Sequence, residues 1–192
     1  MRYGILQRDN LNHIWAIMII NLLVLIATFI EPKLIYILGL RGATVLQMPW
    51  TLVTNLFTHS GIWHVLSNML TLYFFGSFLT RLVGVRNFLI IYFCGGLAGN
   101  LLYLLLASPL NIAVGASGAV FSLGGALTVI TPKLKVLVFP IPVPVPLWIA
   151  VIGGFLLLSL VPYIAWQAHL GGLLFGLLAG LYLRKKTPST FY

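Results

Sequence analysis

The segment Val114-Gly115-Ala116-Ser117-Gly118-Ala119-Val120 places one hydroxyl group among small residues, at the predicted start of an apolar helix. Because Ala116 and Gly118 flank Ser117, little side-chain bulk blocks the approach of another backbone. A serine in the first helical turn also lies beside unpaired backbone N–H groups and the positive end of the helix dipole, which stabilise a developing negative charge. The same pattern is typical of a helix cap at a close-packing site, so both interpretations stay open at this point.

The composition of the whole chain is that of a polytopic membrane protein. Of its 192 residues, 60% are hydrophobic and 7% are charged, and the mean hydropathy is +1.07. A soluble domain of this size cannot cover so much apolar surface with so few polar residues. The net charge of +9 does not indicate nucleic acid as a partner, because the basic residues flank hydrophobic runs, as in loops that face membrane lipids.

Carboxylates are almost absent, since Asp9 and Glu31 are the only two. Glycoside hydrolysis by paired carboxylates and carboxylate-based metal sites therefore lack their parts. The sequence predicts neither a metal nor a cofactor.

The hydrophobic runs predict an all-α bundle of six transmembrane helices that forms a single domain over residues 1–192. Residues 31–61 are too long for a turn and too interrupted for a span, so they predict an interfacial loop with short amphipathic pieces. Alternating prolines predict an extended loop over residues 133–146, because their spacing suits a polyproline conformation. The predicted spans cover residues 13–30, 62–80, 87–107, 117–131, 147–161 and 168–183.

The distribution of basic residues predicts the orientation. Six spans put both termini on one side of the membrane, and that side carries nine basic residues against two, Lys33 and Arg41, on the other. Because positive residues favour the cytoplasmic side, both termini are predicted to be cytoplasmic in a multi-pass protein of the cell membrane. The nine residues are Arg2, Arg8, Arg81, Arg86, Lys133, Lys135, Arg184, Lys185 and Lys186.

Four polar residues from three predicted helices share the extracytoplasmic end. Ser117 and His169 each open a span, and His64 and Asn68 lie on one face of the second span because they are four residues apart. Counting back from the basic residue that ends each helix places these groups at similar depths, roughly 8 Å below the outer boundary of a hydrocarbon core of about 30 Å. One intramembrane His or Asn alone is typical of a bond between helices, but the shared depth favours a site.

This constellation predicts a Ser–His dyad. His169 can accept the proton of Ser117, and no carboxylate is available to orient the imidazole, so packing must hold the ring. The side chains of His64 and Asn68, together with the N–H group of Ser117, are predicted to form an oxyanion hole. His59, in the loop before the second span, is interpreted as a structural hydrogen-bonding residue.

Three motifs resemble those of the rhomboid intramembrane serine proteases. Gly115-Ala116-Ser117-Gly118 resembles the family's G-x-S-G, and Ala168-His169-Leu170-Gly171-Gly172 with Gly176 resembles its A-H-x-x-G-x-x-x-G. The segment from His59 through His64 to Asn68 resembles its H-x-x-x-x-H-x-x-x-N. The resemblance implies Ser117 as nucleophile, His169 as base, and His64 and Asn68 as oxyanion stabilisers. It also implies cleavage of single-span transmembrane proteins near their extracytoplasmic ends.

The chain departs from the family pattern at two informative positions. Trp50 is followed by Thr51, where many members have arginine, and this substitution concerns the anchoring of the 31–61 loop. The aromatic residue four positions after Ser117 is Phe121, where the family has tyrosine, so the ring that packs on His169 is kept and a hydroxyl is lost. Gly172 and Gly176 are predicted to let the sixth span press against the fourth and so set the His169–Ser117 distance.

Two alternatives to a protease remain open from the residues alone. One is a catalytically inactive scaffold that binds membrane helices, although such a protein would be expected to lack Ser117 or His169. The other is a transporter with His64 and His169 as an intramembrane site, which the absence of intramembrane carboxylates and of repeated broken helices disfavours.

Overall fold

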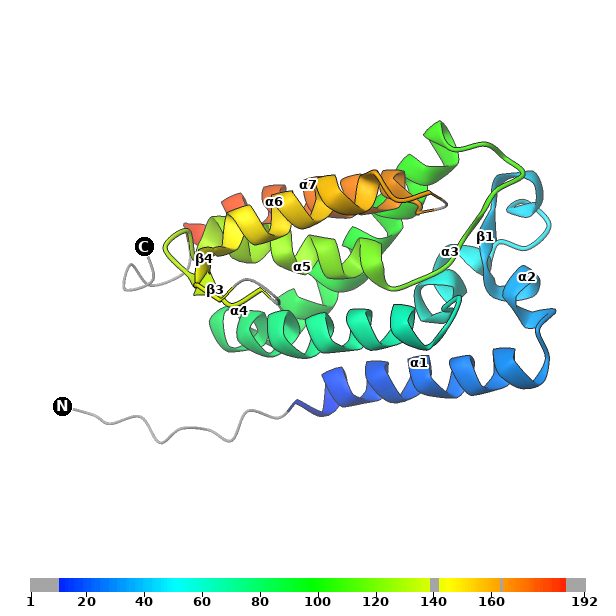
Figure 1. Ribbon diagram of the computed structural model, residues 1–192, viewed down its shortest axis with the longest axis horizontal. Coiled ribbons are helices and arrows are strands. Elements are labelled where there is room, and N and C mark those ends of the chain that lie inside the picture. Colours follow the sequence, from blue (N-terminus) through cyan, green and yellow to red (C-terminus); the bar gives the residue numbers. More distant parts are fainter. Residues whose placement is uncertain (1–10, 139–141, 163, 186–192) are drawn as a thin grey trace.

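The computed structural model describes residues 11–138, 142–162 and 164–185, and these form a bundle of helices with two small β-pairs (Figure 1). Arg2, Arg8, Asp9 and Lys186 lie outside the described residues, as do residues 139–141 of the predicted 133–146 loop. The elements in chain order are α1 (Asn12–Ile30), α2 (Leu34–Leu38), β1 (Leu40–Arg41), η1 (Gly42–Thr44), α3 (Thr51–Thr54), η2 (Asn55–Phe57), α4 (Ile62–Leu106), β2 (Ile112–Ala113), α5 (Ser117–Ile130), β3 (Lys135–Val136), β4 (Val145–Pro146), α6 (Leu147–Ser159) and α7 (Trp166–Arg184).

Within the described residues, three helices are long and apolar enough to cross a membrane, namely α1, α4 and α7. The apolar helices α5 and α6 are shorter, with 14 and 13 residues. At about 1.5 Å per residue they extend only about 20 Å, less than a hydrocarbon core of about 30 Å.

The helix α4 contains the second and third predicted spans without a loop between them. Its 45 residues are interrupted only at Gly84, which has φ 80° and ψ 162°. The chain reverses at this point, from the teal half of α4 to the green half (Figure 1). The helices predicted over residues 62–80 and 87–107 are therefore the two halves of α4, and the turn between them is confined to Gly84, because glycine adopts positive φ without a steric penalty.

The centre of the bundle is α5, which packs against α4, α6 and α7. Ten of its residues are buried, and many are small. A Cβ atom added at Gly172 would collide with the carbonyl of Gly118, and one added at Gly176 would collide with the carbonyl of Ser122. The predicted close approach of the sixth span to the fourth is thus present as backbone contact between α7 and α5.

In contrast, α6 is loosely packed. Its buried residues are Leu147 and Val151, both in its first half, while Leu157 and Leu160 near its end are 69% and 81% exposed. The start of α6 is fixed by the Leu147 N–H group, which donates to the Leu134 carbonyl over 2.8 Å. The helix is therefore buried mainly in its first half, and its last turn is largely exposed.

The predicted interfacial loop is tied to the rest of the molecule by specific bonds. Strand β1 pairs antiparallel with β2, and Arg41 Nε donates to the Leu110 carbonyl over 2.9 Å. Trp50 Nε1 donates to the Ile37 carbonyl over 2.9 Å. The loop is therefore anchored although Thr51, and not an arginine, follows Trp50.

Residues 133–146, predicted to be an extended loop, contain a second pair of short strands. Strand β3 pairs antiparallel with β4, with Lys135 opposite Pro146 and Val136 opposite Val145. This segment is therefore a short hairpin at its base and not an uninterrupted polyproline extension.

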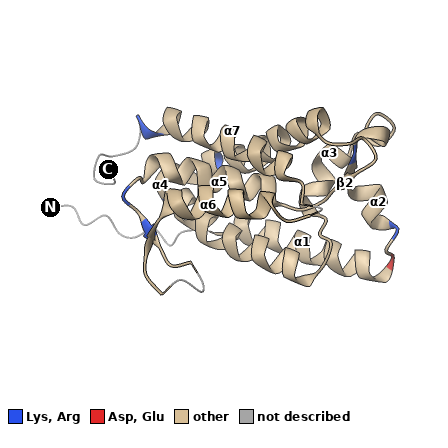
Figure 2. Cartoon of the chain, turned by 45° about the horizontal axis from the view of Figure 1, so that its top comes forward, with Lys and Arg blue, Asp and Glu red and all other residues tan. Residues whose placement is uncertain are grey.

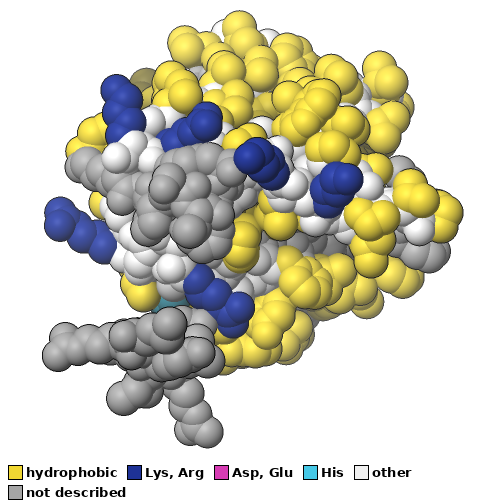
Figure 3. All heavy atoms as spheres, turned by 90° about the vertical axis from the view of Figure 1, so that its left-hand side faces the viewer, with side chains coloured by type: hydrophobic (Ala, Val, Ile, Leu, Met, Phe, Trp, Pro, Cys, Tyr) yellow, Lys and Arg dark blue, Asp and Glu magenta, His cyan; other side chains and the backbone are white. Residues whose placement is uncertain are grey.

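Charged residues separate between the two ends of the bundle (Figure 2). One end carries basic side chains around the Gly84 break, the β3 region and the end of α7, and Figure 3 looks onto this end. The described basic residues there are Arg81, Arg86, Lys133, Lys135, Arg184 and Lys185. The opposite end holds Glu31, Lys33 and Arg41. Between the two ends the surface is apolar, as expected for helices that face lipid.

Candidate active site

Ser117 is the first residue of α5, and it follows a backbone turn at Gly115. Gly115 has φ +123°, a conformation that favours glycine. A Cβ atom at this position would also lie 2.7 Å from His64 Nε2. Gly115 is therefore required both for the turn and for the approach of the His64 ring to the start of α5.

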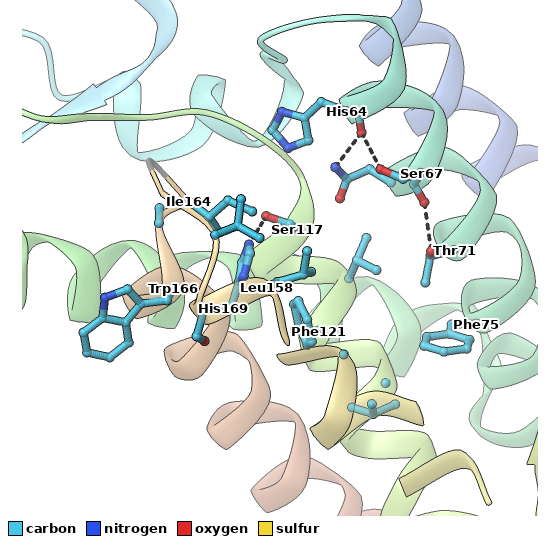
Figure 4. A pocket seen from close by; sticks show the side chains of 18 of the residues that line it. His64, Ser67, Thr71, Phe75, Ser117, Phe121, Leu158, Ile164, Trp166 and His169 are labelled. Atoms are coloured by element: carbon cyan, nitrogen blue, oxygen red, sulfur yellow. Dashed lines mark hydrogen bonds between the residues drawn. The ribbon is translucent and has the colours of Figure 1, made fainter. Parts of the chain in front are cut away.

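His169 lies in the first turn of α7, with its ring directed at Ser117 (Figure 4). The distance from His169 Nε2 to Ser117 Oγ is 2.7 Å, within hydrogen-bond range. The His169 side chain is only 5% exposed. The contact between Gly172 and Gly118 brings the two helices this close, because each residue lies one turn or less from the dyad.

Packing, and not a carboxylate, orients the imidazole of His169. The ring of Phe121 lies beside it, with centroids 4.8 Å apart and planes at 32°. Phe155 in turn contacts Phe121 edge-on at 6.1 Å. His169 Nδ1 is buried and has no hydrogen-bond partner among the described residues. This is the arrangement predicted for a dyad without a third polar member.

His64 and Asn68 both face the region around Ser117, but they differ in what they bond. His64 Nδ1 lies 3.1 Å from Ser60 Oγ, which leaves Nε2 toward Gly115. Asn68 Nδ2 donates to the His64 carbonyl over 2.8 Å, so this amide already supports its own helix. The structure thus brings His64 directly to the start of α5, whereas Asn68 uses part of its donor capacity one turn away.

Backbone donors also gather at the start of α5. The first α5 amide with an acceptor is that of Val120, which donates to the Ala116 carbonyl over 2.9 Å. Among the described residues, the N–H groups of Ser117, Gly118 and Ala119 have no hydrogen-bond acceptor. Such unpaired N–H groups are what an oxyanion requires.

His59 has the structural role that its position suggested, and the structure shows what it holds. It is 1% exposed, and its Nε2 accepts the Ala116 N–H bond over 3.4 Å. Burial away from water, with the adjacent His64 as a second cause, lowers the pKa of His59 from 6.5 to about 3. The ring is therefore neutral at physiological pH and can accept this bond.

Two further polar residues, Asn55 and Asn100, lie behind the site and bond to each other. Nothing in the sequence singled them out, because they are 45 positions apart and belong to no recognised motif. Only the presence of asparagine in apolar surroundings could have drawn attention to Asn100.

Ser117 and His169 open onto a cavity of about 1880 Å³ between the first half of α4, α5 and α6, which we call the site cavity. On the α4 side its wall carries Ser60, Ser67 and Thr71 and, further along the chain, Phe74, Phe75 and Phe78. Figure 4 shows the hydroxyls on one side of the cavity and the aromatic rings below. The cavity is therefore polar beside Ser117 and apolar further along the bundle.

The comparisons with known proteins all point to one family. A family model of the Rhomboid domain matches residues 46–186. The chain is 32% identical over 145 residues to Rhomboid protein 1, mitochondrial, of Saccharomyces cerevisiae, covering 70% of this chain and 42% of that protein. It is 34% identical over 139 residues to RHOMBOID-like protein 1 of Arabidopsis thaliana, covering 68% and 33%. With RHOMBOID-like protein 6, mitochondrial, of the same plant it shares 33% identity over 148 residues, covering 73% and 45%. The chain thus spans less than half the length of these relatives.

Proposed function

This chain belongs to the rhomboid family, and we propose that it is an intramembrane serine endopeptidase in which Ser117 is the nucleophile and His169 the general base. The observation that carries the proposal is the 2.7 Å distance between Ser117 Oγ and His169 Nε2. A nucleophile within hydrogen-bond reach of a base is the geometry that covalent acyl transfer needs. Burial of His169 and its packing on Phe121 keep the imidazole in that position.

The proposed reaction follows the chemistry of serine hydrolysis. Ser117 Oγ attacks the carbonyl carbon of the peptide bond while His169 Nε2 takes the hydroxyl proton. The same proton then passes to the leaving amine, the C–N bond breaks, and an acyl ester on Ser117 remains. A water molecule, deprotonated by His169, hydrolyses this ester and restores the serine hydroxyl.

The oxyanion formed in each step needs donors that are already in place. We assign this role to the N–H group of Ser117 and to His64, with Asn68 as a further donor. The position of Gly115 supports the assignment of His64, because the absence of a Cβ atom leaves room for the ring at the turn before Ser117. Gly118 contributes by exposing its backbone to α7.

We further propose one membrane domain over residues 1–192 with six crossings, in which the two halves of α4 count as separate spans. The gathering of described basic residues at one end of the bundle supports cytoplasmic termini, as the positive-inside rule requires. The dyad lies toward the opposite end, so it would face the extracytoplasmic side of the cell membrane. Lipids cover the remaining apolar surface, and no nucleic acid or cofactor is part of the proposal.

The proposed substrates are single-span transmembrane proteins cleaved near their extracytoplasmic ends. The site cavity supports this class, because its deep part is lined by aromatic and aliphatic side chains that suit a membrane helix. Its hydroxyl-bearing part beside Ser117 suits an exposed peptide backbone. Since a helical peptide bond is shielded from attack, helices weakened by small or helix-breaking residues should be cleaved preferentially.

Labelling of the purified protein with a fluorophosphonate probe tests the proposal. We expect wild type to be labelled, Ser117→Ala not to be labelled and His169→Ala to be labelled much more slowly. Absence of labelling in correctly folded wild type would overturn the proposal and favour a helix-binding scaffold or a transporter. Proteomics of membrane fractions that express wild type or Ser117→Ala would then identify the substrates.

A further inference from the structure

Asn55 and Asn100 form a reciprocal pair of amides behind the dyad. Asn55 Nδ2 donates to Asn100 Oδ1 over 2.8 Å, and Asn100 Nδ2 donates to Asn55 Oδ1 over 2.9 Å. The second N–H bond of Asn100 goes to the Leu52 carbonyl over 2.8 Å. Both residues are 2% exposed. Because buried amides that lose a partner are costly, each asparagine holds the other in place.

The pair connects directly to the backbone that precedes Ser117. The carbonyl of Asn55 accepts the Gly115 N–H bond over 2.9 Å, and His59, four residues further on, accepts the Ala116 N–H bond. Two consecutive amides before Ser117 are therefore fixed to residues 55–59. Asn100 fixes residues 55–59, in turn, to the second half of α4.

The neighbour of Asn100 in α4 fixes the other member of the dyad. A Cβ atom at Gly99 would lie 2.5 Å from the carbonyl of Ala168, the residue before His169. A Cβ atom at Gly171 would likewise lie 2.6 Å from the Ala98 carbonyl. One turn of α4 therefore contacts the residue before His169 through Gly99. The same turn is linked through Asn100 and its partner Asn55 to the backbone before Ser117.

From this arrangement we infer that Asn55 and Asn100 are positioning residues, which lock the start of α5 onto the turn of α4 that also seats His169 and so set the Ser117–His169 distance. The inference rests on the proposed function, because it concerns the geometry of that dyad. A displacement of about 1 Å at a reacting group can cost on the order of 100-fold in rate. Loss of the amide pair should therefore reduce the chemical step while leaving the site cavity, and hence substrate binding, intact.

The decisive variant is the double substitution Asn55→Leu with Asn100→Leu. Removing both partners leaves no unpaired side-chain amide and takes one donor from the Leu52 carbonyl, so the thermal unfolding midpoint in detergent should fall only slightly below that of wild type. We expect the rate of fluorophosphonate labelling and the kcat for a transmembrane substrate to fall about tenfold or more, with KM unchanged. Wild-type labelling and kcat in this folded double variant would overturn the inference.

Two further variants keep the test decisive. Asn55→Ser retains a buried hydrogen-bonding group, so it should fold even if the double variant does not, yet it is too short to make both bonds to Asn100. Ser122→Ala is the matched control, because Ser122 Oγ is buried and donates to the Ile91 carbonyl of α4 over 2.6 Å, away from residues 111–117. Asn55→Ser should label more slowly than Ser122→Ala, and equal rates would refute positioning by the pair.

Failure of this inference is distinguishable from failure of the proposed function. If wild type is not labelled, the peptidase assignment itself is wrong. If wild type is labelled in a Ser117-dependent manner and the asparagine variants match it, only the positioning role is lost.

Discussion

The backbone of Gly172 in α7 packs directly against the carbonyl of Gly118 in α5, one residue beyond Ser117. Because His169 precedes Gly172 by one helical turn, this contact limits how far its ring can lie from the Ser117 hydroxyl. Any side chain at position 172 has to push the two helices apart.

We therefore expect Gly172→Val to insert into the membrane but to lose activity by about 100-fold, since reacting groups misplaced by about 1 Å lose that much in rate. The rate of fluorophosphonate labelling and the amount of membrane-inserted protein measure the two effects. Gly153→Val is the matched control, because a Cβ atom at Gly153 in α6 meets nothing within 4 Å. Full activity of Gly172→Val would show that the dyad does not depend on close contact between α5 and α7.

Phe121 is expected to act through its ring alone. The ring lies beside His169, where a hydroxyl is not needed to orient the imidazole. Phe121→Tyr should keep activity within about threefold, whereas Phe121→Leu should lose about tenfold, the amount expected for one aromatic pair. Cleavage kinetics with a transmembrane substrate measure both. Equal loss in the two variants would mean that the volume of phenylalanine matters and not its ring.

The two proposed oxyanion side chains should differ in importance. His64 Nε2 lies at the turn before Ser117, whereas one N–H bond of Asn68 is already donated to the His64 carbonyl. We expect His64→Ala to lower kcat by about 100-fold, as for removal of a main oxyanion donor, and Asn68→Ala by about tenfold. Leu66→Ala, a change at a half-exposed side chain of the same helix, is the control. A larger loss for Asn68→Ala would reverse the assignment.

His59 should make the stability of the fold depend on pH. Its pKa is about 3 in the folded protein against 6.5 ordinarily, so between these values the unfolded chain binds a proton that the folded protein does not. The free energy of unfolding therefore falls as the pH drops through this range, by up to about 1.4 kcal/mol per pH unit. His59→Gln keeps an acceptor and does not titrate.

The measurement is the thermal unfolding midpoint in detergent at about pH 7 and about pH 5, which lie on either side of the ordinary histidine pKa. The decrease should be smaller in His59→Gln than in wild type. His64 and His169 are present in both proteins, so their titration is common to both. An identical decrease would show that His59 is not the source.

The positions of the helices followed from the sequence because burial in lipid is a local property of each apolar run. The starts of α1, α4, α5 and α6 agree with the predicted spans to within one residue, and α7 begins two residues earlier. The pairing of Ser117 with His169 could also be predicted from the sequence, because counting residues along straight helices gives each side chain's depth. The reversal between residues 80 and 87 was predicted as well, but its confinement to Gly84 was not, since glycine in a helix and glycine in a turn look alike without φ.

The sequence by itself thus located the apolar helices, and it predicted a shared depth for the polar residues and the chemistry of a serine–histidine pair. Only the tertiary structure decided the 2.7 Å distance between Ser117 and His169, the pairing of β1 with β2 and the bond between Asn55 and Asn100. The physical reason is that these contacts depend on the rotation and separation of whole helices. Those quantities are set by backbone packing at glycines from several segments at once, and no single segment contains that information.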